Sequence, residues 1–114
     1  MVVARTSHRS VLAGLVLAGL DPVWVAPDVD PATGLALAVP PERVERALGD
    51  HPEAKAVILV EPSYLGLSSD VASIARIAHD HGAALLCDQA WGAHFAFSGS
   101  LPACAVTPAP TRWS

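Results

Sequence analysis

Short apolar runs separated by turn residues organise this chain. Val2–Ala4, Ala56–Val60 and 84–87 are continuous apolar runs, which is typical of strands buried on both faces of a parallel sheet. Val23–Val25 is a shorter run rich in residues that favour strands. Helical patterns lie between them. The expected helices start at Ser7 or His8 and end near Gly19, start at Pro40-Pro41-Glu42 and end near Gly49, and follow a Ser69-Asp70 cap up to Gly82.

The order of these elements predicts the fold class. Helices alternate with short strands along the chain, and residues 28–34 have the composition of a turn. Such alternation is typical of an α/β protein whose parallel strands are joined by right-handed helical crossovers. We therefore expect a three-layer α/β unit with a parallel sheet.

Composition narrows the class of protein further. Of the 114 residues, 52% are hydrophobic and 16% are charged, a balance typical of part of a buried α/β domain. The net charge of −4 and pI near 5.6 give no electrostatic reason to expect nucleic acid or an anionic membrane as partner. The apolar run that ends at Asp21-Pro22 is shorter than the roughly 20 residues needed to span a bilayer, and no signal-peptide pattern is present. We expect a cytoplasmic protein in which Cys87 and Cys104 are thiols and not a disulfide.

The segment after the last predicted strand carries the most specific chemistry. Asp88 follows the apolar run 84–87, and small, aromatic and imidazole side chains come directly after it. Ligands of open α/β sheets bind outside the carboxyl ends of the strands, so Asp88 occupies a position that could contact a bound cofactor. The small residues Ala90 and Gly92 would let a flat ring approach the backbone closely.

Three motifs in the same order resemble the Orn/Lys/Arg decarboxylase family, pyridoxal-phosphate enzymes of fold type I. Residues 88–94, Asp-Gln-Ala-Trp-Gly-Ala-His, resemble the family's Asp-x-Ala-(His or Trp) segment. Residues 5–10, Arg-Thr-Ser-His-Arg-Ser, resemble its Arg-x-x-His-x-Ser segment. Residues 61–66, Glu-Pro-Ser-Tyr-Leu-Gly, are similar to its Pro-(Thr/Ser)-Tyr-x-Gly turn. The resemblance extends over the chain to about residue 106.

The resemblance implies a cofactor and a role for each site residue. Asp88 would form a salt bridge with the protonated ring nitrogen of pyridoxal 5'-phosphate, which keeps the ring able to accept electrons. His8 would stack on one face of the ring and Ala90 would contact the other, with Trp91 beside them. His8 and Asp88 are the implied catalytic residues, and His8, Asp88, Ala90 and Trp91 the implied cofactor-binding residues.

Each of these residues also has a purely structural interpretation. Asp88 could close a strand, His8 could cap the following helix, and Trp91 could be a packing residue. Ser63 and Tyr64 are either turn residues or pocket residues. The remaining positions are less specific. His94 would support the residues that contact the cofactor without contacting it itself. Arg5 and Ser10 either orient the His8 segment or lie on the surface.

The sequence gives no convincing metal site. His79 and His81 are two residues apart and do not share a helix face. Asp28, Asp30 and Gly34 weakly resemble a calcium loop, but Pro31 and the missing terminal glutamate argue against one.

Two parts of the family pattern are absent. The family's phosphate-binding loop and its Ser-x-His-Lys Schiff-base segment have no counterpart, and Lys55 matches nothing catalytic. We therefore expect residues 1–107 to be a partial cofactor-binding large domain without activity of its own. Residues 108–114 look like an aberrant tail, because codons ending in G would encode Gly-Ala-Asp-Ala-Val-Val in another frame.

The favoured function is decarboxylation of lysine, ornithine or arginine by the intact family enzyme, expected to be a homodimer or higher homo-oligomer. The alternatives are another fold-type-I activity, such as an aminotransferase or lyase, and a non-catalytic α/β binding module. A nucleotide-binding module of this kind would require a glycine-rich phosphate loop after an early strand, and the sequence has none.

Overall fold

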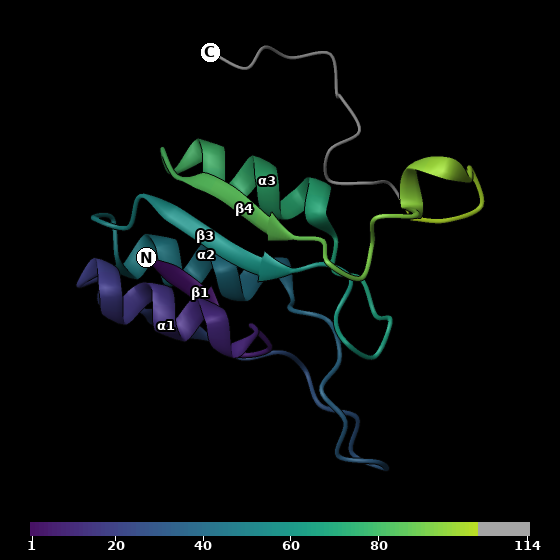
Figure 1. Ribbon diagram of the computed structural model, residues 1–114. Coiled ribbons are helices and arrows are strands. Elements are labelled where there is room, and N and C mark those ends of the chain that lie inside the picture. Colours follow the sequence, from purple (N-terminus) through teal and green to yellow (C-terminus); the bar gives the residue numbers. More distant parts are fainter. Residues whose placement is uncertain (103–114) are drawn as a thin grey trace.

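Four parallel strands and three helices make up most of the computed structural model, which describes residues 1–102 (Figure 1). The strands are adjacent in the order β2-β1-β3-β4. Their predicted parallel α/β arrangement is confirmed. The elements in chain order are β1 (Val2–Ala4), α1 (Arg9–Ala18), β2 (Val23–Val25), α2 (Pro41–Asp50), β3 (Ala56–Val60), α3 (Val71–Asp80), β4 (Ala84–Asp88) and a 3-10 turn (Phe95–Phe97).

The crossovers place the helices on both faces of the sheet. The connection from β1 to β2 runs toward one edge, and the connections from β2 to β3 and from β3 to β4 run toward the other. Because parallel crossovers are right-handed, α1 lies on one face and α2 and α3 lie on the opposite face (Figure 1).

The hydrophobic core lies between the sheet and the α2–α3 layer. Alternate strand residues point to this side, among them Val57 and Leu59 of β3. They meet Val44 and Leu48 of α2 and Ile74 of α3, all of which are fully or almost fully buried. The other face is less complete, because α1 buries only Leu15.

The helix ends follow the sequence signals. Asp70 caps α3 by accepting a hydrogen bond from Ser73 N at 3.0 Å. Pro41 occupies the first turn of α2, where a missing N–H costs nothing. Gly19 ends α1 with a φ of 65°, a conformation that other residues rarely adopt.

Several details differ from the expectations. The first helix begins at Arg9, after His8, because His8 itself is the cap. Asp88 is the last residue of β4 and pairs with Val60, so the strand extends one residue further than predicted. The 3-10 turn at Phe95–Phe97 was not predicted. The predicted tail at 108–114, together with Cys104, lies outside the described residues.

Candidate functional site

At the carboxyl ends of the strands, the sheet has a topological switch point between β1 and β3. The chain leaves β1 toward one edge of the sheet and leaves β3 toward the other. The two segments that follow, at Arg5–His8 and at Glu61–Gly66, therefore separate and leave a crevice between them. Ligands of open α/β sheets bind in such crevices.

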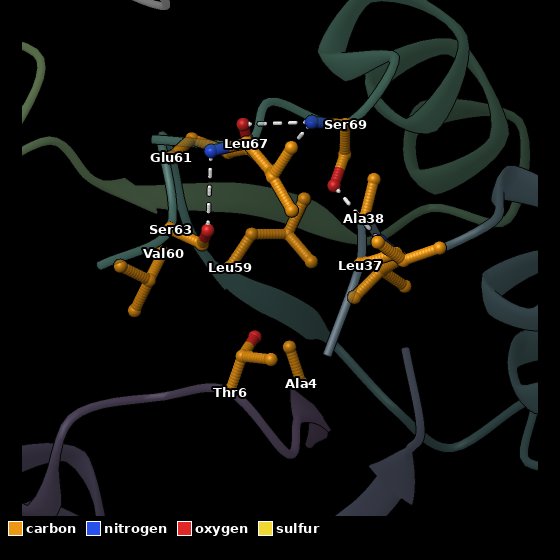
Figure 2. Close-up of a pocket in the computed structure, with 11 residues that line it drawn as sticks. Ala4, Thr6, Leu37, Ala38, Leu59, Val60, Glu61, Ser63, Leu67 and Ser69 are labelled. Atoms are coloured by element: carbon orange, nitrogen blue, oxygen red, sulfur yellow. Dashed lines mark hydrogen bonds between the residues drawn. The ribbon is translucent and has the colours of Figure 1, made fainter. Parts of the chain in front are cut away.

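A shallow groove occupies this position (Figure 2). Ala4 and Thr6 line it from the β1 side, and Leu59, Glu61 and Ser63 line it from the β3 side. The groove extends toward residues 37–39 and Ser69, on the α2–α3 side of the sheet. Sequence reasoning placed Ser63 in a possible pocket but missed Thr6 and Glu61.

Asp88 lies beside this crevice, at the end of the strand next to β3. Its Oδ1 accepts a hydrogen bond from Ala90 N at 3.1 Å, and its backbone oxygen accepts one from Glu61 N at 2.9 Å. Within residues 1–102 its Oδ2 has no hydrogen-bond partner. Asp88 thus closes the strand as the structural interpretation suggested, yet it keeps one carboxylate oxygen available.

Strand alternation decides which way Asp88 faces. Leu59 and Leu85 point toward the α2–α3 layer, so Asp88 belongs to the opposite set, with Leu86. The side chain of Asp88 is therefore on the α1 side of the sheet. His8 follows β1, and its helix α1 is on this same side.

His8 caps α1, as its structural interpretation predicted. Its Nδ1 accepts a hydrogen bond from Ser10 N at 3.2 Å and lies 2.9 Å from Ser10 Oγ. The residue is exposed, so capping leaves the ring faces and Nε2 accessible. His8 follows β1 and Asp88 ends β4, and β3 lies between these two strands, whose axes are roughly 10 Å apart.

The hydroxyl of Ser7 lies in the segment that follows β1. It is buried and has no hydrogen-bond partner among residues 1–102. Buried polar groups are nearly always satisfied, so an unpaired one beside the switch point marks a position where a polar group of a ligand or a further segment would fit. Arg5, by contrast, is exposed and contributes a backbone hydrogen bond to Val25 at 2.9 Å.

Two aromatic side chains meet above the edge. Trp91 and Tyr64 contact edge to face, with ring centroids 6.4 Å apart. They are 59% and 80% exposed, so Trp91 is not part of the buried core. Ala90 beside them is also exposed. His94 contacts Phe95 edge to face and is exposed, and no contact links it to Asp88.

The structure explains the glycine at position 92 by a contact within the chain, whereas the sequence analysis attributed it to the approach of a flat ring. A Cβ at this position would lie 2.7 Å from Pro62 Cδ and 3.2 Å from the Glu61 backbone oxygen. Gly92 therefore permits close contact between two segments of this chain, which explains the residue without a bound ring.

Two titratable groups face the α2–α3 side near the edge. Burial raises the pKa of Glu61, and hydrogen bonds from Ser69 only partly oppose this effect. Burial, together with the nearby charge of Glu61, raises the pKa of Cys87 to about 11. Cys87 is thus a half-buried neutral thiol, in agreement with the expected free cysteine.

The described residues hold no group of three or more possible metal ligands, and no helix among them is long and apolar enough to cross a membrane.

Comparison with known proteins identifies the family. The profile of the Orn/Lys/Arg decarboxylase major domain matches residues 1–108. The chain belongs to the Orn/Lys/Arg decarboxylase family. Within curated relatives, it is 33% identical over 106 residues to arginine decarboxylase of Halalkalibacterium halodurans and 32% identical to that of Bacillus subtilis. It is 39% identical to the Bacillus subtilis protein YaaO. These matches cover 93% of this chain but only 22% of each relative.

A solved structure supports the fold assignment. A tetra mutant of aspartate aminotransferase from Thermus thermophilus matches with a TM-score of 0.60 and 26% sequence identity. The match covers 75% of this chain and 23% of that protein. The α/β unit of the decarboxylase family member is therefore part of a fold-type-I large domain.

Proposed function

We propose that this chain is the ring-binding part of a pyridoxal-phosphate-dependent decarboxylase that acts on a basic amino acid. The observation that carries the proposal is the position of Asp88, a carboxylate at the carboxyl end of the strand beside the switch point, with one oxygen that has no hydrogen-bond partner among residues 1–102. Membership of the decarboxylase family and the arginine decarboxylase names of two relatives support this choice of reaction.

Two residues at the carboxyl ends of the strands suit a flat ring with a protonated nitrogen. The Oδ2 of Asp88, which has no hydrogen-bond partner among residues 1–102, suits a protonated ring nitrogen, and the exposed Ala90 leaves room against the backbone. The hydroxyl of Ser7, in the segment after β1, is buried and has no hydrogen-bond partner among residues 1–102. When bound, the cofactor supplies a sink for the electrons released as the Cα–carboxylate bond breaks.

The chain's own residues hold and orient the reacting groups. Asp88 would keep the ring nitrogen protonated by placing a negative charge beside it. His8 would stack on one ring face and position the substrate carboxylate, and Ala90 would contact the opposite face. Trp91, whose ring contacts Tyr64 edge to face, would lie beside the cofactor.

We further propose that the 114-residue chain has no decarboxylase activity by itself. Its only lysine, Lys55, directly precedes β3, whereas Asp88 ends the neighbouring parallel strand β4. These positions are at opposite ends of two neighbouring strands. They are separated along the strand direction by five residues, or roughly 17 Å. Lys55 cannot reach a ring held at the carboxyl edge.

A chimera tests the proposed reaction. We would replace the matching segment of Bacillus subtilis arginine decarboxylase with the matching residues of this chain and supply lysine, ornithine and arginine in turn. Carbon dioxide release from one of them, with the diamine or agmatine as product, supports the proposal. A folded, cofactor-loaded chimera that forms a keto acid and releases no carbon dioxide would support an aminotransferase, which is the activity of the solved neighbour.

The partner and the location stay predictions. We propose a small amino acid as the ligand, a homodimer or higher homo-oligomer as the assembly of the intact enzyme, and the cytoplasm as its location.

A further inference from the structure

Glu61 is the only buried charged side chain within residues 1–102, with 4% of its surface exposed. Its two carboxylate oxygens accept from one donor, Ser69 N, at 2.9 and 3.0 Å. Ser69 in turn accepts a hydrogen bond from Val39 N through its Oγ at 3.1 Å (Figure 2). One carboxylate therefore joins the end of β3 to the segment before α3, and through Ser69 to the segment before α2.

The backbone of Glu61 makes a second connection, to residues 88–92, which are the end of β4 and the turn after it (the Asp88 turn). Glu61 N donates to the backbone oxygen of Asp88 at 2.9 Å. Gly92, at the far end of the same turn, lies so close that a Cβ there would be 3.2 Å from Glu61 O and 2.7 Å from Pro62 Cδ. The Asp88 turn thus rests on residues 61–62 at both of its ends.

We propose that Glu61 is a positioning residue, whose carboxylate fixes residues 61–62 to the start of α3 and thereby holds the Asp88 turn in place. The inference rests on the proposed function for its consequence, since a displaced Asp88 would no longer face the cofactor ring.

The orientation of Glu61 argues against a direct role at the ring. Glu61 lies two residues after Leu59 and lines the same groove on the α2–α3 side, whereas Asp88 faces the α1 side. A leucine would fill the space without the cost of burying a charge, but it could not accept the hydrogen bond from Ser69 N. The carboxylate thus specifies a geometry that apolar packing alone would not.

Three variants of the full 114-residue chain separate this role from simple packing. Glu61→Ala removes the acceptor, Glu61→Gln keeps an amide oxygen that can accept from Ser69 N, and Glu45→Ala removes an exposed glutamate of α2 as a control. Amide hydrogen exchange, measured by mass spectrometry at low micromolar concentration, reports on the segments that contain Ser69, Ala90 and Gly92.

We expect Glu61→Ala to speed exchange in both segments by about tenfold or more, with the Glu45→Ala chain unchanged. Glu61→Gln should restore exchange to within about threefold of the original chain. Faster exchange near Ser69 alone, with Ala90 and Gly92 as before, would overturn the proposal because the carboxylate would then act only locally.

A cofactor measurement links the geometry to the proposed function. Pyridoxine 5'-phosphate lacks the aldehyde and cannot react with lysine, so its binding reports the non-covalent contacts of the ring and the phosphate without a Schiff base. Glu61→Ala should weaken this binding by about fivefold or more, and Glu61→Gln should not. The measurement uses the decarboxylase chimera, because the family's phosphate-binding loop has no counterpart in this chain. If the chimera with unchanged Glu61 binds none, the proposed function fails while the exchange result still decides the positioning role.

If Glu61→Ala has no cooperative unfolding transition, Gly92→Ala provides the test. It separates the Asp88 turn from Pro62 without touching the carboxylate, and Gly99→Ala, where a Cβ meets nothing within 4 Å, is its control. Faster exchange at Ala90 in Gly92→Ala alone supports the proposal. Identical exchange in the two glycine variants contradicts it.

Discussion

The two faces of the sheet are both apolar, but they differ in how completely they are covered. Toward α2 and α3, Val57 and Leu59 are enclosed and Leu48 of α2 is 1% exposed. Toward α1, Leu86 of β4 is 47% exposed and Leu17 of α1 is 89% exposed. Within residues 1–102, one face is a packed core, and the other has apolar side chains that no segment covers. Asp88 and the α1 cap His8 both belong to the open side, so the candidate site borders the incomplete face.

A leucine-to-alanine substitution in α2 and another in α1 give the strongest test of this difference between the two faces. Leu48→Ala should lower the free energy of unfolding by about 2–5 kcal/mol, because it leaves a cavity in a packed core. Leu17→Ala should change it by less than about 0.5 kcal/mol, because an exposed side chain is removed. Chemical denaturation of both variants measures the difference. Equal losses would show that the α1 face is packed in solution.

Self-association tests whether the open face is exposed. Contiguous apolar surface promotes association between molecules. We expect the original chain to associate at micromolar concentration, and Val16→Lys with Leu17→Lys to shift it toward monomer in sedimentation experiments. Ala72→Lys with His79→Lys adds as many lysines on exposed positions of α3 and should have little effect. Equal shifts from both pairs would indicate that charge alone is responsible.

The helix caps on the two faces should also differ. Asp70→Ala should cost about 1 kcal/mol of stability, because Asp70 accepts hydrogen bonds from both the backbone and the hydroxyl of Ser73. These bonds lower the pKa of Asp70, so its contribution should be lost as the pH falls through the lowered pKa. His8→Ala should cost less than about 0.5 kcal/mol, since the histidine is exposed and its cap bond is longer. A larger loss for His8 would favour a structural role for it.

A smaller, pH-dependent effect is expected for Glu61. Burial raises its pKa above the ordinary value of 4.5, so the folded state binds this proton more tightly than the unfolded state. The free energy of unfolding should therefore fall as the pH rises from 4.5 through the raised pKa. Cys87, which faces Glu61, stays neutral throughout because its pKa is about 11.

Glu61→Gln isolates this contribution, because the other titrating groups cancel in the comparison. The stability of Glu61→Gln relative to the original chain should increase as the pH rises through that window. A difference that does not change with pH would show that Glu61 titrates as it does in the unfolded chain.

The sequence predicted the elements well and the contacts at the site less well. Continuous apolar runs such as Ala56–Val60 marked the strands, because both faces of a parallel strand are buried. The Asp70 cap and Gly19 end were also readable, since both depend on local chemistry. The motif at 88–94 predicted the edge of the sheet on which the candidate site lies, because it directly follows an apolar run.

Non-local contacts account for what the sequence did not reveal. The role of Glu61 depends on Ser69 N, eight residues away, and on the Asp88 turn, which reaches it only through the pairing of β3 and β4. An acid directly after a buried strand and before a proline was the available signal. Gly92 was attributed to a bound ring because its contact with Pro62 exists only in the folded chain.

The most direct test of the central claim is turnover by the decarboxylase chimera with Asp88→Asn. Asparagine is nearly isosteric with aspartate, so the change removes the charge and keeps the fold. With cofactor saturating, we predict that kcat falls at least about a hundredfold, equivalent to roughly 2.7 kcal/mol of transition-state stabilisation. Turnover close to that of the parent chimera would remove Asp88 from the site and contradict this account.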